Sequence, residues 1–209
     1  DADFHSEAGR NNNPVGQAVF VLDTENLEAG WKRLADFPGT PRFDSATAAV
    51  NGKIYVFTGI YAPLKKTMSS LYHNVVDSWV YDTEKNMWTR LKDLPHGANR
   101  RAVVFKNRYI IMVGGYKYPK TRNFDGSVNL EVYTLEEKTL EWKDFFEKTV
   151  LVYDTKTDRL GTADFLLEQT SWPGVGIQDD TIFSLGGEGG MKLWHPDTFQ
   201  IGKITEIKP

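Results

Sequence analysis

Short apolar runs bounded by polar turn residues recur along this chain, and three of them end in glycine. The three runs are rich in β-branched and aromatic side chains and cover residues 53–59, 108–115 and 180–187. Runs of this length and composition predict β-strands. Because similar runs return at intervals of tens of residues, the chain is predicted to fold as a series of repeated modules.

A second short run precedes each glycine-ended run, and the two together predict a β-hairpin. In the first copy, residues 45–50 and 53–57 are separated by Asn51-Gly52, a dipeptide that favours the two positive φ angles of a type I′ turn. The later copies have different turn residues and are expected to pair residues 101–105 with 109–113, and 174–177 with 181–185.

Another hairpin is predicted after each of the first two. Its turn begins at the aspartate of a Tyr-Asp-Thr sequence, Asp82 in one copy and Asp154 in the other, and such side chains can accept hydrogen bonds from turn amides. The flanking strands are predicted at residues 78–81, 87–91, 150–153 and 159–163. A similar hairpin is predicted ahead of the first repeat, at residues 18–22 and 31–35. An outer pair of strands is predicted behind the last repeat, at residues 191–194 and 202–207.

Two consecutive hairpins make a four-stranded antiparallel meander, which is the blade of a β-propeller. The sequence therefore predicts an all-β fold, a partial propeller of about three and a half blades that forms one domain over residues 1–209. The repeats are expected at residues 15–41 (a half blade), 42–95, 96–168 and 169–209. Residues 130–148, rich in Glu, Lys and Leu, are expected to include a short helix, and Trp31, Tyr81 and Trp88 are expected in the core.

This number of blades is too small for a closed ring, because propellers typically close with four to eight. A half-ring would expose sheet edges and an apolar blade face, and both promote association. We expect the missing propeller half, a second chain or self-association to complete the ring. Since the chain starts at Asp1 without a methionine, further residues are also expected ahead of it.

Composition narrows the range of functions. The chain has 209 residues, of which 40% are hydrophobic and 25% charged, as is usual for a globular domain. Its formal charge of -3 provides no basic field for nucleic acid or an anionic membrane. The absence of cysteine excludes disulfides, thiolate catalysis and cysteine-ligated zinc, and the scattered histidines lack the spacing of metal ligands. No targeting segment is recognised in these residues, so the sequence leaves the compartment open.

Several of these residues resemble known families. The glycine pair, the Val-Tyr-Asp-Thr sequences at 80–83 and 152–155 and the tryptophan that follows the first of them resemble the kelch repeat. A closer resemblance is to the bacterial sialic-acid mutarotases, also called N-acetylneuraminate epimerases. It rests on Phe-Pro-Gly-Thr-Pro-Arg at 37–42, Asp-Phe-Phe-Glu-Lys at 144–148, Leu-Val-Tyr-Asp at 151–154 and Gly187-Glu188. The likeness covers nearly the whole chain but about half of that family's six-bladed ring, and the order of the matching parts suits a circularly permuted relative.

The resemblance implies an isomerase without a cofactor that interconverts the anomers of a sialic acid or a related acidic sugar. It implies a location in the bacterial periplasm or outside the cell, and it implies that Glu188 is the catalytic residue. In the family an arginine follows this glutamate by a few positions, whereas this chain has Met191-Lys192-Leu193-Trp194 there. Lys192 or an arginine from another blade could take that place.

The predicted meander brings charged residues to one rim of the propeller. Strand one of a blade begins at the edge where strand two ends, so this rim is expected to hold Arg42, Arg100, Arg101, Trp172 and Glu188. Arg10 lies in a loop on the same face, and loops on a rigid scaffold commonly build binding sites. A carboxyl group can move the protons that open and reclose a sugar hemiacetal. A guanidinium can hold a sugar carboxylate in a bidentate fork, so the arginines and Lys192 are predicted to bind the substrate.

Other interpretations of these residues stay open. Glu188 can instead accept hydrogen bonds from glycine amides at a loop start, and each arginine can instead link adjacent blades through carbonyl groups. The chain is then either a mutarotase-like enzyme or a kelch module that binds a protein or glycan without chemistry. The copper cofactor of galactose oxidase is excluded because it needs cysteine, and the Asp-box of sialidases, the Gly-x-Ser-x-Gly elbow and the phosphate-binding loop are absent from the sequence.

Overall fold

The computed structural model describes residues 16–62, 72–118, 120–130, 145–189 and 198–205. These residues form a succession of β-sheets, with a short 3₁₀ turn, η1 (Leu27–Ala29), near the start. Among them no helix has the length and hydropathy that crossing a membrane requires. The all-β prediction is therefore confirmed, while most of the helix expected at residues 130–148 lies outside the described residues.

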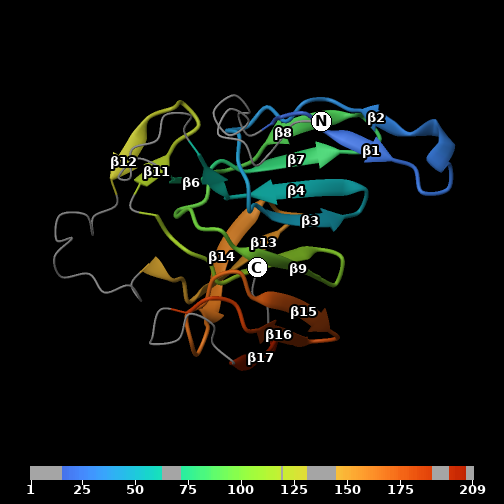
Figure 1. The fold of residues 1–209 in the computed structure, drawn as a ribbon. Helices are drawn as coiled ribbons and strands as arrows, with labels where there is room; N and C mark the ends of the chain where they lie inside the picture. The colour runs from blue at the N-terminus through green and yellow to red at the C-terminus, as the bar shows by residue number, and fades with distance from the viewer. Residues whose placement is uncertain (1–15, 63–71, 119, 131–144, 190–197, 206–209) are drawn as a thin grey trace.

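Two complete blades lie at the centre of the fold (Figure 1). Each is a four-stranded antiparallel meander, as the sequence predicts. The first consists of β3 (Ala46–Val50), β4 (Lys53–Phe57), β7 (Trp79–Asp82) and β8 (Met87–Arg90). The second consists of β9 (Arg101–Phe105), β10 (Tyr109–Val113), β13 (Thr149–Asp154) and β14 (Arg159–Phe165).

Smaller sheets flank these two blades. The predicted half blade is the hairpin of β1 (Phe20–Leu22) and β2 (Trp31–Arg33), which lies beside β7 and β8 in Figure 1. The last blade has three strands among the described residues, in the order β15 (Gly174–Gln178), β16 (Thr181–Leu185) and β17 (Phe199–Lys203).

The third strand of the last blade differs from the prediction. β17 pairs with β16 from Thr181↔Lys203 to Leu185↔Phe199, so residues 199–203 take the position expected for residues 191–194, which lie outside the described residues. In this register the ring of Phe199 stacks on that of Phe183, with centroids 5.9 Å apart. The outer strand predicted at residues 202–207 is wrong, because its first two residues belong to β17 and no described strand pairs with the outer edge of β17.

The tight turns confirm the inner hairpins. Asn51 and Gly52 have φ angles of 49° and 70°, the left-handed pair that a type I′ turn requires. Lys106 and Asn107 repeat this geometry in the second blade, with φ angles of 50° and 46°. The left-handed pair thus recurs with Asn107 in the place of Gly52, although the second hairpin has one more residue in its connection, since Phe105 pairs with Tyr109 and Val50 with Lys53.

The outer turns repeat in comparable detail. The tyrosine of each Tyr-Asp-Thr sequence donates a hydrogen bond of 2.7 Å to the last turn residue, in the pairs Tyr81–Asn86 and Tyr153–Asp158. In the second copy Arg108 Nη2 lies 2.6 Å from Asp154 Oδ2, and this hydrogen bond holds the pKa of Asp154 well below its usual range. The recurring turn sequence is therefore explained by the contacts that close the turn.

The core lies between the faces of neighbouring blades. The first and second blades bury a cluster that includes Ala46, Ala48, Val50, Tyr55, Phe57, Ile110, Met112, Leu151 and Tyr153. A second cluster, around Ile111 and Val113, lies between the second and third blades. Face-to-face packing of successive sheets buries both faces of the middle blade, as a propeller requires.

The predicted aromatic core is confirmed for two of its three members. Tyr81 is buried, and Trp88 packs against both Tyr81 and Phe37, with ring centroids 4.9 and 5.0 Å apart. Trp31 is 67% exposed, so its assignment to the core is wrong. The reason is geometric, because no other described blade packs against the half blade on that side.

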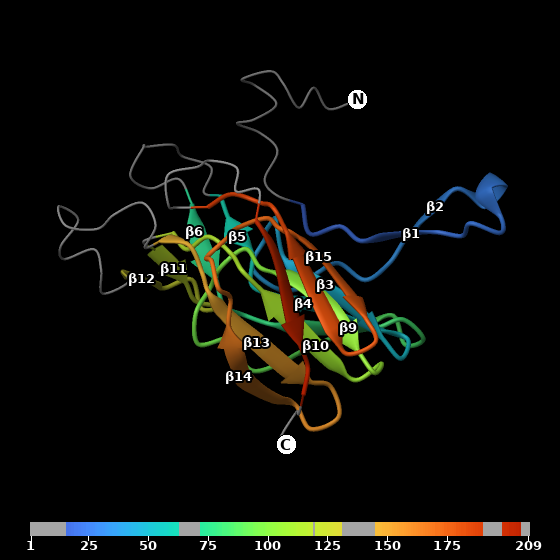
Figure 2. The same ribbon diagram turned by 90° about the horizontal axis from the view of Figure 1, so that it is seen from below.

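The loops between the hairpins build a sheet of their own, which the sequence did not predict. It has the strand order β12 (Val128–Leu130), β11 (Lys120–Arg122), β6 (His73–Val75) and β5 (Ile60–Tyr61). The pairing of β6 with β11 is parallel and joins the loop of the first blade to the loop of the second. Figure 2 shows this sheet at one end of the blades, where it supports one rim of the propeller.

Candidate functional site

The glycine-ended strands bring three equivalent residues to one rim. Ile60, Tyr116 and Glu188 each follow a glycine, and each forms an isolated bridge with another rim residue, in the pairs Phe43↔Ile60, Tyr116↔Phe146 and Ser171↔Glu188. The Gly115 amide also donates to the Thr170 carbonyl at 2.8 Å and so joins the second blade to the third. The rim predicted from the meander is therefore continuous across three blades.

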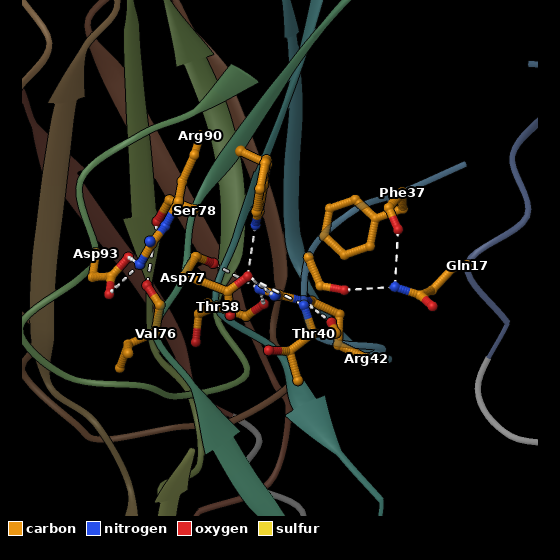
Figure 3. A network of polar contacts seen from close by, with 12 residues as sticks. Gln17, Phe37, Thr40, Arg42, Thr58, Val76, Asp77, Ser78, Arg90 and Asp93 are labelled. Carbon is orange, nitrogen blue, oxygen red and sulfur yellow. Dashed lines mark hydrogen bonds and ion pairs between the residues drawn. The ribbon is translucent and has the colours of Figure 1, made fainter. Parts of the chain in front are cut away.

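Arg42, one of the predicted substrate-binding residues, is enclosed by its own blade (Figure 3). Its Nη1 donates to the carbonyl oxygens of Thr58 and Asp77, at 3.0 and 2.7 Å, and its Nε donates to the Thr40 carbonyl at 2.8 Å. Its Nη2 pairs with the Asp77 carboxylate, and the arginine side chain is 3% exposed. Burial lowers the pKa of Arg42, and the charge of Asp77 opposes that shift.

Arg100 repeats this arrangement in the second blade. Its Nη1 donates to the Thr149 carbonyl at 2.6 Å, and its Nη2 donates to Glu147 Oε2 at 2.7 Å. Lys117 Nζ lies 2.6 Å from the other oxygen of Glu147. Burial alone would raise the pKa of Glu147, but the charges of Arg100 and Lys117 outweigh it and the pKa is lowered. Both arginines thus bind carbonyl groups, mostly within their own blades, and Arg42 also reaches the Thr40 carbonyl in the repeat expected at residues 15–41.

Arg101 lies at the start of β9 and has a different environment. Its side chain is 36% exposed, and its Nη1 lies 3.7 Å from Asp44 Oδ1, which is longer than a hydrogen bond. Among the described residues its guanidinium forms an ion pair with Asp44 and no hydrogen bond. It is therefore able to bind an anionic ligand in a way that Arg42 and Arg100 are not.

Asp44 connects the three blades at this rim. The indole Nε1 of Trp172 donates to Asp44 Oδ2 at 2.7 Å, while Arg101 faces the other carboxylate oxygen. These three residues come from the first, second and third blades. Sequence reasoning missed Asp44, although one signal was available: residues 43–45 separate Arg42 from its strand, whereas Arg100 is followed at once by Arg101.

Glu188 is half-buried next to a pair of tyrosines. Its backbone exchanges two hydrogen bonds of 2.8 Å with Ser171, which fixes the residue at the rim. Burial and the charge of Glu188 raise the pKa of Tyr116 to about 12. Burial also raises the pKa of Tyr118, and the charges of Tyr116, Tyr72, Asp44 and Glu188 add to that shift. The charges of the Asp44 and Glu188 carboxylates therefore both raise the pKa of Tyr118.

An aromatic row extends along this side of the site. Successive ring centroids are 5.8, 5.3, 4.8 and 5.9 Å apart in the order Phe43, Tyr72, Tyr118, Tyr116 and Phe145. Phe43 and Tyr72 are each 38% exposed, so part of the row reaches the surface. The row was not predicted, because its members come from loops that only the extra sheet brings together.

The remaining predicted residues are placed as follows. Arg10 and Lys192 lie outside the described residues. Among the residues that the structure describes, no group of three or more His, Asp or Glu side chains could hold a metal ion. The rim therefore presents Glu188, Arg101, Asp44 and Trp172 together, beside a wall of aromatic rings.

Comparison with known proteins assigns this fold and sequence to a family. A family model described as N-acetylneuraminate epimerase matches residues 13–188. The chain belongs to the N-acetylneuraminate epimerase family. This membership agrees with the resemblance of the motifs at residues 37–42, 144–148 and 187–188. It also agrees with the repeated blades.

Individual relatives support the family assignment. An N-acetylneuraminate epimerase of Yersinia pestis is 34% identical over 225 residues, which cover 91% of this chain and 55% of the relative. N-acetylneuraminate epimerase 1 of Escherichia coli is 28% identical over 189 residues, which cover 83% of this chain and 49% of the relative. A kelch domain-containing protein of Vibrio cholerae is 35% identical over 111 residues, or 52% of this chain and 30% of the relative.

A solved structure supports the fold. The structure of YjhT superimposes with a TM-score of 0.61 at 20% sequence identity and covers 94% of this chain and 66% of that protein. The family member described here thus spans about half the length of the curated relatives that it matches. The order of the blades relative to those proteins, and with it the circular permutation, stays a prediction.

Proposed function

We propose that this chain forms part of a mutarotase that interconverts the anomers of N-acetylneuraminate or a related acidic sugar. The observation that carries this proposal is the position of Glu188 on the rim where Arg101, Asp44 and Trp172 meet. Family membership supports the same reaction class, because the matching family and several relatives are named N-acetylneuraminate epimerase. The proposed reaction needs no cofactor, because it only moves protons and opens and closes one C–O bond.

Glu188 is the proposed proton shuttle. As a carboxylate it takes the proton from the anomeric hydroxyl, and the resulting carbonyl forms as the bond between the anomeric carbon and the ring oxygen breaks. The same carboxyl group then delivers its proton to the ring oxygen. The ring closes again on the opposite face of the carbonyl by the reverse steps. A positioned general acid–base group of this kind accelerates such a step by about 10²–10⁴-fold.

Arg101 is the proposed partner for the sugar carboxylate. A guanidinium binds a carboxylate through two parallel N–H bonds, and Arg101 is the rim arginine whose N–H groups are not taken up by carbonyl oxygens among the described residues. The aromatic row offers apolar ring faces to the sugar. Arg10 and Lys192, which lie outside the described residues, are proposed as further contacts to the sugar.

Anomer exchange of the free sugar tests this proposal. We expect the full chain to accelerate exchange between the anomers of N-acetylneuraminic acid, measured by exchange NMR, in proportion to protein concentration. Glucose, a neutral sugar, is the control and its exchange should stay at the spontaneous rate.

Two other outcomes would contradict the proposal. Saturable binding of the sugar without any acceleration would instead favour a kelch module that binds a glycan without chemistry. If the chain neither binds the sugar acid nor changes its exchange rate, the proposed mutarotase function is wrong for this chain, and a kelch module that binds a protein or another glycan is the alternative that is left.

A further inference from the structure

Asp44 is a charged group at the rim that the proposed reaction does not use. Its side chain is 29% exposed, and its two oxygens face residues of two other blades, Trp172 at 2.7 Å and Arg101 at 3.7 Å. Its charge also helps to raise the pKa of Tyr118, as does the charge of Glu188. Asp44 thus lies among the groups assigned to sugar binding and proton transfer.

Asp44 and Trp172 both have left-handed backbone conformations, which are uncommon for a residue as bulky as tryptophan. Asp44 has a φ angle of 54° and Trp172 one of 50°, both in the left-handed region. Bulky side chains rarely adopt this region, and such residues cluster at functional sites because surrounding contacts must hold them there. The hydrogen bond between the two side chains is such a contact, and it joins two segments separated by 128 residues.

The extension that carries Asp44 occurs in the first blade. Ala46 and Arg101 occupy equivalent positions at the start of the first strand of their blades. Each pairs with the last residue of the second strand, Phe57 in the first blade and Val113 in the second. Arg100 directly precedes Arg101, whereas three residues separate Arg42 from Ala46. The extra residues move the Asp44 carboxylate to the Arg101 side chain of the neighbouring blade.

We propose that Asp44 is a positioning residue that orients Arg101 toward the carboxylate of the bound sugar, with Trp172 fixing the Asp44 side chain. This inference rests on the proposed function. The firm hydrogen bond is to Trp172, so the carboxylate is held in place before a ligand arrives. Its second oxygen attracts Arg101 without forming a hydrogen bond, so the guanidinium keeps its N–H groups for the sugar carboxylate. Asp44 therefore makes the site selective for acidic sugars over neutral ones.

The substitution Asp44→Asn tests this role with little change in shape. Asparagine tolerates a left-handed φ angle and its carbonyl can still accept the Trp172 hydrogen bond, but its neutral amide no longer attracts Arg101. Binding of N-acetylneuraminic acid and of its neutral methyl ester is measured by titration calorimetry. We expect the preference for the acid over the ester to fall about tenfold in Asp44→Asn, because Arg101 is no longer oriented to make its charge-assisted contact with the sugar carboxylate.

Matched variants separate this role from a structural one. Asp36→Asn removes another aspartate paired with an arginine, in a pair whose side chains are 61% and 51% exposed, and should leave the preference unchanged. In a chain that already carries Arg101→Met, Asp44→Asn should have no further effect on the preference, because Asp44 acts through Arg101. Thermal unfolding of each variant shows whether the fold is retained.

The outcomes distinguish this inference from the proposed function. An unchanged preference in Asp44→Asn would overturn the inference, and so would a stronger preference, since that would show that Asp44 merely repels the sugar carboxylate. Binding that prefers the acid and depends on Asp44, without anomer exchange, would support the inference while the proposed reaction fails. If the wild-type chain shows no preference for the acid, the inference fails as well.

Discussion

Arg42 and Arg100 hold their blades together through buried carboxylates. Each guanidinium lies next to an acidic side chain from a later part of its repeat, Asp77 for Arg42 and Glu147 for Arg100. Removing one partner of such a pair leaves an uncompensated charge in the interior, which costs about 3–5 kcal/mol. At the scale of single residues, these two arginines therefore support the rim and leave ligand binding to Arg101.

We predict that Asp77→Ala strongly destabilises the chain. The Asp77 carboxylate is 0% exposed and accepts hydrogen bonds from Arg42, from Trp79 Nε1 and from the Thr40 amide, so its loss leaves these three donors without that acceptor and one charge unpaired. The free energy of unfolding in urea should fall by about 3–5 kcal/mol. Asp36→Ala, which removes a surface ion pair, should cost below about 1 kcal/mol. Equal urea midpoints for the two variants would show that the pair with Arg42 is unimportant.

The position of a residue along its strand was enough to predict which residues lie at the rim. Glu188 and Arg101 were placed at the rim because strand ends fix the rim. The burial of Arg42 and Arg100 was not predictable, since their carboxylate partners lie 35 and 47 residues further along the chain. Asp44 was missed because its partner Trp172 comes from another blade.

The glycine that ends the third inner hairpin determines how Glu188 reaches the rim. Gly187 has a φ angle of 98°, and a Cβ atom there would lie 2.3 Å from the Ser171 carbonyl and 2.6 Å from Thr170 Oγ1. The absence of a side chain lets this strand end pack directly against the segment that leads into β15, the first strand of the same blade. The Ser171–Glu188 bridge depends on that close approach.

We predict that Gly187→Ala costs about 2 kcal/mol or more of unfolding free energy, because it combines a clash with a left-handed φ angle. It should also lower anomer exchange, since Glu188 is displaced with its backbone. Gly161→Ala is the matched control, because a Cβ atom at Gly161 would meet nothing within 4 Å. Urea denaturation and exchange NMR of both variants check this, and a Gly187→Ala chain as stable and active as the control would refute it.

At the scale of elements, the turn residues were enough to predict the hairpins. The pairing of strands that are distant in the sequence was not predicted. Asn51-Gly52 and the two Tyr-Asp-Thr turns located six strands from sequence neighbours alone. The position of β17 was wrong because residues 191–194 and 199–203 both carry strand-like patterns, and the pairing with β16 selects the second. The loop sheet was missed because its strands are short and pair across distant segments.

At the scale of the whole molecule, the fold brings distant parts of the chain to one rim of the propeller. Asp44 belongs to the first blade, Arg101 and Tyr118 to the second and Glu188 to the third, and they interact because successive blades rotate the same rim toward a common centre. The kelch-like repeats were sufficient to predict this architecture, since the repeat alone fixes which strand ends share a rim. The identity of the interacting pairs depended on loop lengths, which the repeat does not specify.

Both ends of the described fold expose apolar side chains. Phe20 and Trp31 on the half blade are 52% and 67% exposed, and Phe199 and Ile201 on β17 are 55% and 59% exposed. Exposed apolar patches of this kind mark interaction surfaces. Completion of the ring by the missing propeller half, a second chain or self-association stays a prediction, and the curated relatives leave room for it because the chain covers about half of their length.

The sharpest test of the proposed reaction is the anomer exchange rate of N-acetylneuraminic acid with saturating wild-type or Glu188→Gln chain. Glutamine keeps the size of the side chain and one acceptor oxygen, but its amide cannot take up the proton, so we predict that the acceleration falls by about 10²-fold or more while the sugar still binds. Exchange at the wild-type rate in Glu188→Gln would contradict the role of Glu188 and, with it, the assignment of this rim as the active site.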